Sequence, residues 1–118
     1  MSEEIRIMMY EVIGSPLCVA SSDGQKVFER IHTALNANRK VLLSFHNVTA
    51  LTSAFLNAAI GQLYGRFDEN HIRSLLKVED AEQDDLALLK RVVDNAKLYF
   101  KNTNKLNKAI QETINNEI

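Results

Sequence analysis

The stretch between Lys40 and Phe67 constrains the fold of this chain more than any other. It opens with a short apolar run, Val41 to Phe45, which is typical of a strand covered on both faces. After the hydroxyl pair Thr52-Ser53, apolar residues recur at helical spacing and predict an amphipathic helix of about four turns. The apolar positions of this helix are Phe55, Leu56, Ala59, Ile60, Leu63, Tyr64 and Phe67. Two hydroxyl side chains are therefore expected where a buried strand gives way to a helix.

Strand patterns flank this stretch on both sides. Alternating apolar residues predict a first strand over residues 5–13, and Leu17–Ala20 form a second short strand or an extended connector. Between them, Gly14-Ser15-Pro16 would allow a hairpin, which leaves the pairing of the first strand open. Residues 72–78 alternate again and predict a later strand.

Two further segments have helical patterns. The first has Ser22 as N-cap with Gln25 three residues on, the form of a capping box, and ends near residues 36–38. The second follows an acidic run, with Asp84 as its cap. Its core-facing positions are Leu86, Leu89, Val92, Val93, Ala96, Tyr99 and Phe100. Strands that alternate with helices predict an α/β domain with about four strands in a mostly parallel or mixed sheet and with helices packed against it.

The last part of the chain is predicted to be a helical extension of residues 102–118, separate from a domain of residues 1–101. Apolar residues recur there at every fourth position, namely Leu106, Ile110, Ile114 and Ile118, among polar residues rich in Asn. So narrow a stripe rarely stabilises a lone helix. We therefore expect it to fold back on the domain, to pair with a second copy as a homodimer, or to dock on a partner.

Composition restricts the class of protein. The chain has 118 residues, enough for one domain with a hydrophobic core, and its net charge of −1 gives no field that would recruit nucleic acid or an anionic membrane. Cys18 is the only cysteine, which excludes an internal disulfide and suits a reducing cytoplasm. No apolar run approaches the ~20 residues of a membrane span, and the first residues lack the pattern of a signal peptide. We expect a cytoplasmic protein that binds neither nucleic acid nor membrane.

Ser53 is the residue to which a chemical role is most readily assigned. The first turn of a helix has unpaired N–H groups and tolerates a phosphate, and phosphoserine adds about −1.5 to −2 charge to an otherwise neutral surface. Thr52 or Ser53 can equally be an N-cap alone, or part of a neutral surface that contacts a partner. The histidines lack metal-ligand spacing, and no glycine-framed elbow surrounds Ser53, which would be the nucleophile of a catalytic triad with His46 as its base. We expect no metal site, no cofactor and no enzymatic activity.

Several motifs resemble the STAS fold, found in anti-anti-sigma factors and in the cytoplasmic domains of sulfate transporters. They are Asp23-Gly24, the strand Val41–Phe45, Asn47-Val48-Thr49 and the run Thr52-Ser53-Ala54-Phe55-Leu56-Asn57. The likeness extends over roughly residues 4–100, and it is closest to a STAS-like bacterial family found near ATP-binding, kinase-type partners. Anti-anti-sigma factors carry an Asp-Ser pair whose serine is phosphorylated by a cognate kinase. That serine aligns with Ser53 and the aspartate with Thr52, while Ala54-Phe55 replace the small Ser/Thr-Gly that usually follows.

The resemblance implies a non-enzymatic regulatory module that binds an ATP-binding, kinase-like or anti-sigma-like protein through the start of the helix at Ser53, with phosphorylation of Ser53 as the candidate switch. The expected partner-contact residues are Asn47, Thr49, Thr52, Ser53 and Asn57. Two alternatives stay open. The C-terminal helix could make the protein an oligomerising structural subunit, or the domain could carry a lipid or another small ligand in a pocket lined by Phe28, Phe55 and Tyr64.

Overall fold

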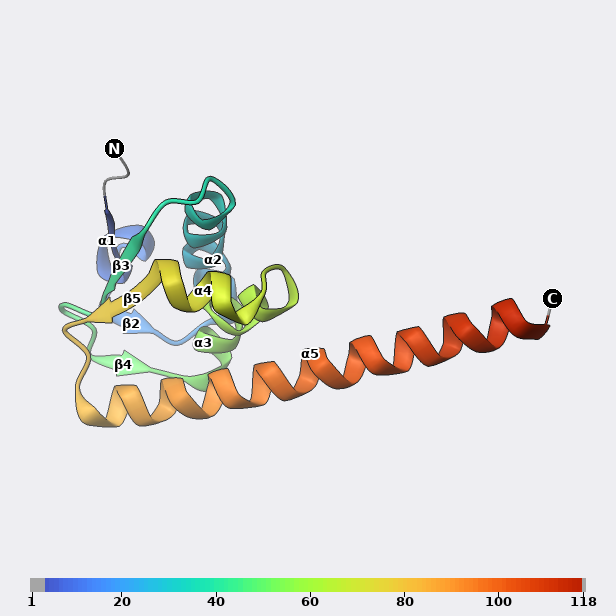
Figure 1. Ribbon diagram of the computed structural model, residues 1–118. Coiled ribbons are helices and arrows are strands. Elements are labelled where there is room, and N and C mark those ends of the chain that lie inside the picture. Colours follow the sequence, from blue (N-terminus) through green and yellow to red (C-terminus); the bar gives the residue numbers. More distant parts are fainter. Residues whose placement is uncertain (1–3, 118) are drawn as a thin grey trace.

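The computed structural model describes the backbone of residues 4–117 and the side chains of residues 4–103 (Figure 1). The elements, in chain order, are β1 (Ile5–Met8), α1 (Met9–Ile13), β2 (Leu17–Cys18), α2 (Ser21–Asn36), β3 (Val41–Ser44), β4 (Ala50–Leu51), α3 (Ser53–Ala59), the 3₁₀ helix η1 (Gly61–Gly65), α4 (Glu69–Leu75), β5 (Leu76–Glu79) and α5 (Gln83–Glu117). Position 118, the last of the predicted tail row, lies outside the described residues.

The strands of the described region form two separate sheets, and every pairing is parallel. One sheet has the order β1-β3-β5, with Ile5 opposite Val41 and Val41 opposite Leu76. The other pairs β2 with β4, and Leu17 lies opposite Ala50. The predicted α/β class and parallel pairing are therefore confirmed, but the strands divide into three and two instead of about four in one sheet. A hairpin at residues 14–16 does not form, because β1 pairs with β3 and β2 with β4.

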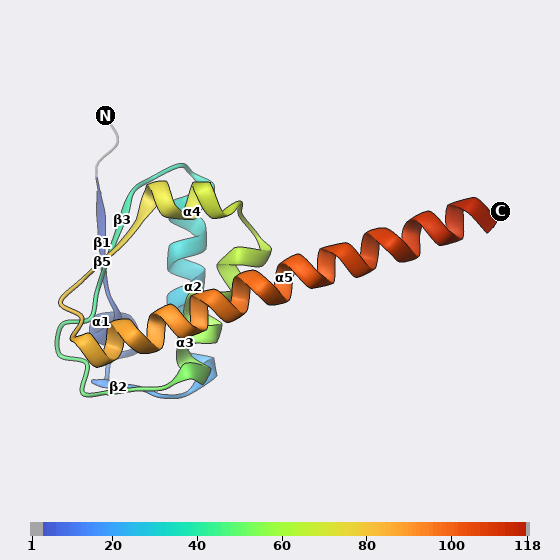
Figure 2. The same cartoon turned by 60° about the horizontal axis from the view of Figure 1, so that its bottom comes forward.

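Helices cover one face of the three-stranded sheet, and on the other face the central strand β3 is partly covered, with Leu42 half-buried and Ser44 buried, so the expected cover on both faces of this strand is met only in part. The inward row of paired residues is Ile7, Leu43 and Val78, of which Ile7 and Leu43 are buried. The neighbouring row, Arg6, Leu42 and Lys77, lies on the opposite face, where Arg6 and Lys77 are exposed. Figure 2 shows α2, α3 and α4 together on one side of these strands.

The core lies between the sheet and the pair of helices α2 and α3. These helices cross very closely at Gly24, which is buried. A Cβ atom there would lie under 3.0 Å from the backbone carbonyl oxygen of Phe55 and 2.9 Å from the Cβ of Ala58. The close crossing lets both helices press large side chains into the sheet; those fully buried include Val27, Ile31, Leu35, Phe55 and Leu56.

The first strand is shorter than predicted, because the chain turns into α1 at Met9. Strand β3 ends at Ser44, which pairs with Met8, so β1 has no partner beyond that point. A helix satisfies the backbone groups of the following residues internally. Helix α1 is capped by Gly14, whose φ of 70° is in the left-handed region and whose N–H donates to the carbonyl oxygen of Tyr10.

Three other element predictions are also corrected. Helix α2 begins at Ser21, so Ser22 lies inside the first turn and is not the cap. The cap position is taken by Ala20, which has no side-chain oxygen to accept a hydrogen bond. The helix predicted from residue 52 to residue 67 breaks at Ile60, which has φ −123° and ψ −43°, and continues as η1. The strand expected over residues 72–78 begins only at Leu76, since α4 occupies the residues before it.

Helix α5 runs without a break from Gln83 to Glu117, so the predicted extension from residue 102 is its direct continuation (Figure 1). Asp84 lies in the first turn and not at the cap. Of the predicted core stripe, Val92 and Ala96 are buried, while Leu89, Val93 and Phe100 are half-buried and Leu86 and Tyr99 are exposed.

Candidate functional site

Ser53 is the first residue of α3, and its side chain is exposed. The cap is made by Thr52, whose Oγ1 accepts a hydrogen bond from the N–H of Phe55 (3.1 Å). The same hydroxyl donates to the carbonyl oxygen of Val19 (2.6 Å), so it ties the start of α3 to the end of β2. Among the described residues, the hydroxyl of Ser53 has no hydrogen-bond partner. Of the two hydroxyls, Thr52 is structural and Ser53 is presented to solvent.

Two exposed apolar side chains lie beside this helix start. Leu17 is 53% exposed and Val19 is 43% exposed, and both flank the buried Cys18 in the β2 segment. Two hydrogen bonds from Thr52 hold this segment in place. The N–H of Thr52 donates to the carbonyl oxygen of Cys18 (3.1 Å), and the hydroxyl of Thr52 donates to the carbonyl oxygen of Val19. Sequence reasoning missed these two residues, because a run of four small apolar residues does not reveal which side of a two-residue strand faces water. We call Leu17, Val19, Thr49, Thr52, Ser53 and Asn57 the α3 patch.

The other predicted contact residues are placed unevenly around Ser53. Thr49 precedes β4 and is exposed; its N–H donates to the carbonyl oxygen of Pro16 (2.9 Å), which brings it to the same two-stranded sheet. Asn57 is exposed one turn further along α3. Asn47 is exposed in the turn after β3, with φ 64°, and is separated from Ser53 by the length of β4. The structure therefore groups Thr49, Thr52, Ser53 and Asn57, and places Asn47 at the margin.

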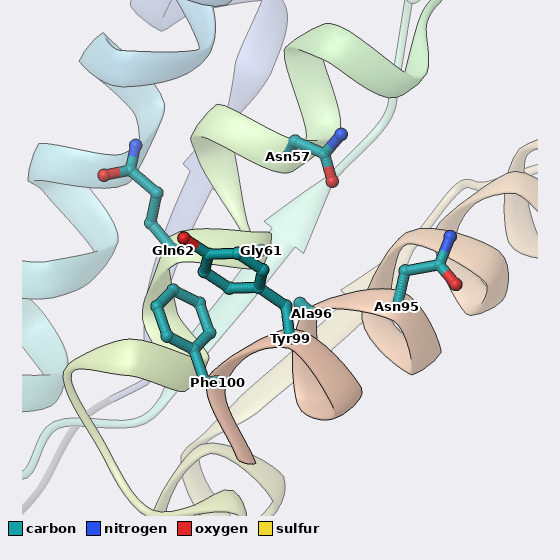
Figure 3. A pocket seen from close by; sticks show the side chains of 7 residues that line it. All are labelled: Asn57, Gly61, Gln62, Asn95, Ala96, Tyr99 and Phe100. Carbon is teal, nitrogen blue, oxygen red and sulfur yellow. The ribbon is translucent and has the colours of Figure 1, made fainter. Parts of the chain in front are cut away.

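A cavity of about 310 Å³ opens beside Asn57, between η1 and α5 (Figure 3). Its lining residues are Asn57, Gly61, Gln62, Asn95, Ala96, Tyr99 and Phe100. The rings of Tyr99 and Phe100 stand edge to face, with centroids 5.0 Å apart. This is not the pocket that the sequence predicted: Phe28 and Phe55 are buried in the core. Tyr64 lines a different cavity of about 220 Å³ between α4 and α5.

An ion-pair cluster centred on Glu69 forms part of the lining of that second cavity. The carboxylate of Glu69 lies 2.7 Å from Lys97 of α5 and 2.7 Å from Arg73 of α4. The hydrogen bond from Lys97 is the main reason that the pKa of Glu69 is below its ordinary value. The Nζ of Lys97 also lies 5.9 Å from the ring centroid of Tyr64, whose pKa is raised, chiefly by burial. This cluster clamps α4 to α5.

Cys18 is fully buried, and burial raises the pKa of its thiol to about 11. It is therefore a small core residue. Across the part of the chain that the structure describes, no three His, Cys, Asp or Glu side chains come together as metal ligands do. In that same part, no helix has the length and apolar character needed to cross a bilayer.

A comparison with protein-family models matches residues 23–86, more than half of the chain, to a family described as a STAS-like domain of unknown function (DUF4325). The chain belongs to this family. The matched segment of the STAS-like domain runs from the first turn of α2 to the first turn of α5, so it contains α3 and Ser53. The resemblance that the motifs predicted is thereby confirmed over these residues. Searches of curated proteins and of solved structures found no match.

Proposed function

We infer that this STAS-like domain is a non-enzymatic regulatory module that binds another protein through the α3 patch. The partner that the family resemblance implies is an ATP-binding, kinase-type or anti-sigma-like protein. The observation that carries this proposal is the exposed hydroxyl of Ser53 at the start of α3, next to the exposed side chains of Leu17 and Val19.

The chemistry of the α3 patch supports protein recognition. It combines two apolar side chains with hydroxyl and amide groups and contains no charged residue. Apolar anchors surrounded by polar groups that exclude water are the arrangement from which interface hot spots are built. The patch is also rigid, because Thr52 bonds both to α3 and to the end of β2, so a partner would pay little entropy to order it.

We extend the proposal to a phosphate switch at Ser53. In this step the Oγ of Ser53 attacks the γ-phosphorus of ATP, the bond to the ADP oxygen breaks, and the hydroxyl proton passes to a base of the kinase. Because Thr52 supplies no carboxylate, the base and the magnesium ligands come from the partner. A phosphate would place about −1.5 to −2 charge on the neutral patch and would expel the partner by desolvation and repulsion.

The test is a binding titration between the purified chain and a purified ATP-binding, kinase-type candidate. We expect Ser53→Ala to bind like the unmodified chain and Ser53→Glu to bind at least about tenfold more weakly, a change of roughly 1.4 kcal/mol. Ser74→Glu is the matched control, because Ser74 is an exposed serine of α4, outside the α3 patch, and this variant should bind normally. Equal affinity of Ser53→Glu and Ser74→Glu would refute the docking surface.

Phosphorylation is tested separately from docking. The chain is incubated with the candidate, ATP and Mg²⁺, and the site of any phosphate is assigned by mass spectrometry. Phosphate on Ser53 that disappears in Ser53→Ala supports the switch. Tight binding without phosphate on Ser53 would remove the switch and leave the docking surface in place.

A further inference from the structure

Helix α5 carries one row of residues that begins inside the domain and continues past it. Val92 and Ala96 are buried, and the next residue of the row, Tyr99, is 63% exposed at the mouth of the Figure 3 cavity. In the sequence the row goes on through Thr103, Leu106 and Ile110 with spacings of four and three residues. This alternation keeps residues on one side of a helix and is typical of helix–helix seams.

The continuing row is separated from the charges of the same segment. At about 100° per residue, the positions of Lys101, Lys105, Lys108 and Glu112 lie about 140° or more around the helix from position 110. The residues beside the row are Asn, Thr, Ala and Gln. Past Thr103, the first charged residue on the row itself is Glu117. The second half of α5 therefore has one neutral side with aliphatic positions at its centre.

Phe100, the residue after Tyr99, still contacts the domain. The ring of Phe100 packs directly on Gly65, where a Cβ atom would collide with it. Beyond that contact, α5 projects away from the rest of the chain in both views (Figures 1 and 2). The helix from Thr103 to Glu117 is about 21 Å long, and helices in proteins take most of their stability from the packing of an amphipathic face.

We propose that a second copy of this chain covers the row, with the two α5 helices antiparallel and a two-fold axis near Ile110. In this arrangement Glu117 lies opposite Thr103 of the other copy, so the pairing brings no like charges of the row together. Leu106, Ile110 and Ile114 are equally spaced in the sequence, so a two-fold axis at Ile110 places Leu106 opposite Ile114 of the other copy.

Parallel pairing is excluded by the position of the domain. The globular part of each copy lies on the same side of α5 as the row, where it buries Val92 and Ala96. Two parallel copies would bring both globular parts to the same place beside the seam. The antiparallel arrangement puts the two globular parts at opposite ends of the pair. Each projecting segment then lies along the projecting segment of the other copy and ends before it reaches that copy's globular part.

The first test is the mass of the full chain as a function of concentration. The paired segments are short and bury less than the roughly 1,200 Å² of a stable interface, so the dimer is weak and reversible. Sedimentation velocity from about 10 to about 500 μM should show the 13.4 kDa monomer giving way to a species of twice that mass. Ile110→Asp should remain monomeric throughout, whereas Lys108→Asp, which introduces the same residue on the charged side, should dimerise like the unmodified chain.

The second test is the direction of pairing. Under mild oxidation, a mixture of Thr103→Cys and Glu117→Cys chains should form a mixed disulfide, while Thr103→Cys alone should not cross-link to itself. The native Cys18 is buried and does not interfere. Circular dichroism of each variant establishes that the domain is folded. A chain that stays monomeric at the highest concentration, equal loss of dimer in both aspartate variants, or a Thr103→Cys homodimer would overturn the proposal.

Discussion

Replacing Gly24 with alanine tests the close crossing of α2 and α3. Gly24 is an interior residue of α2 with no left-handed backbone, so by helix propensity alone the change should stabilise the protein by about 1 kcal/mol. The structure predicts the opposite sign. The added methyl group would lie under 3.0 Å from the backbone oxygen of Phe55 and 2.9 Å from the Cβ of Ala58, whereas ordinary contact begins at 3.4 Å.

The cost of this clash follows from what must move. A backbone carbonyl and a Cβ have no rotamer by which to escape, so α2 and α3 must separate by about half an ångström or more, which weakens the packing beneath them. Overpacking of this kind costs about 1–3 kcal/mol, and the backbone contact argues for the upper end. After the gain in propensity is subtracted, we expect a net destabilisation of about 2 kcal/mol, or a fall in Tm of about 8 °C.

The assay is urea unfolding followed by far-UV circular dichroism, with a lower midpoint and an unchanged slope as the expected result. Gly61→Ala is the matched control, because a Cβ at Gly61 would lie 3.4 Å from Oδ1 of Asn57, an ordinary distance to a movable side chain. That variant should differ from the unmodified chain by less than about 0.5 kcal/mol. A Gly24→Ala protein that is as stable as the unmodified chain, or more stable, would refute the close crossing of α2 and α3.

Three further measurements probe single groups. Thr52→Ala removes both the cap and the hydrogen bond to Val19, so its free energy of unfolding should fall by about 2 kcal/mol. Ser53→Ala should change the free energy of unfolding by less than about 0.5 kcal/mol. Equal effects would contradict the assignment of Thr52 as structural and Ser53 as exposed to solvent. The pKa of Glu69 is lowered by Lys97, so its stabilising contribution is present above about pH 4.5 and is lost as the pH falls through the folded-state pKa. The unmodified chain should therefore exceed Glu69→Gln in stability at pH 7, and the difference should vanish in acid. Cys18, with a pKa of about 11, should react with Ellman's reagent at pH 8 only after unfolding, and rapid reaction of the native protein would show that the thiol is accessible.

Elements with strong local signals were predictable. The strand that begins at Val41, the end of α2 near Asn36 and the cap at residue 52 or 53 all follow from patterns a few residues long. The Met9–Ile13 segment was not predictable, because its apolar residues fit a strand and a helix equally well. Its outcome is decided by β3, which ends at Ser44 and leaves β1 without a partner.

The break after α3 has a similar cause in tertiary contact. The apolar spacing from Phe55 to Phe67 fits one continuous helix, and nothing local requires it to stop at Ile60. The structure shows Gly61 close to α5, with Ala96 and Val92 side-chain atoms 3.7 Å from the position of a Cβ. The chain tightens into η1 where α5 passes, and that neighbour is distant in sequence. The exposure of Leu17 and Val19 in the candidate site likewise depends on the pairing of β2 with β4.

The two proposed surfaces are separable, because they lie on different elements. The α3 patch occupies the end of β2 and the first turns of α3, whereas the self-association row lies beyond Phe100 on α5. Among the described residues, Asn57 connects them, since it is one turn past Ser53 and lines the cavity that ends at Tyr99. Ser53→Glu should therefore leave the concentration dependence of the mass unchanged, and Ile110→Asp should leave partner affinity unchanged. Loss of both properties in either variant would mean that the patch and the row are parts of one interface.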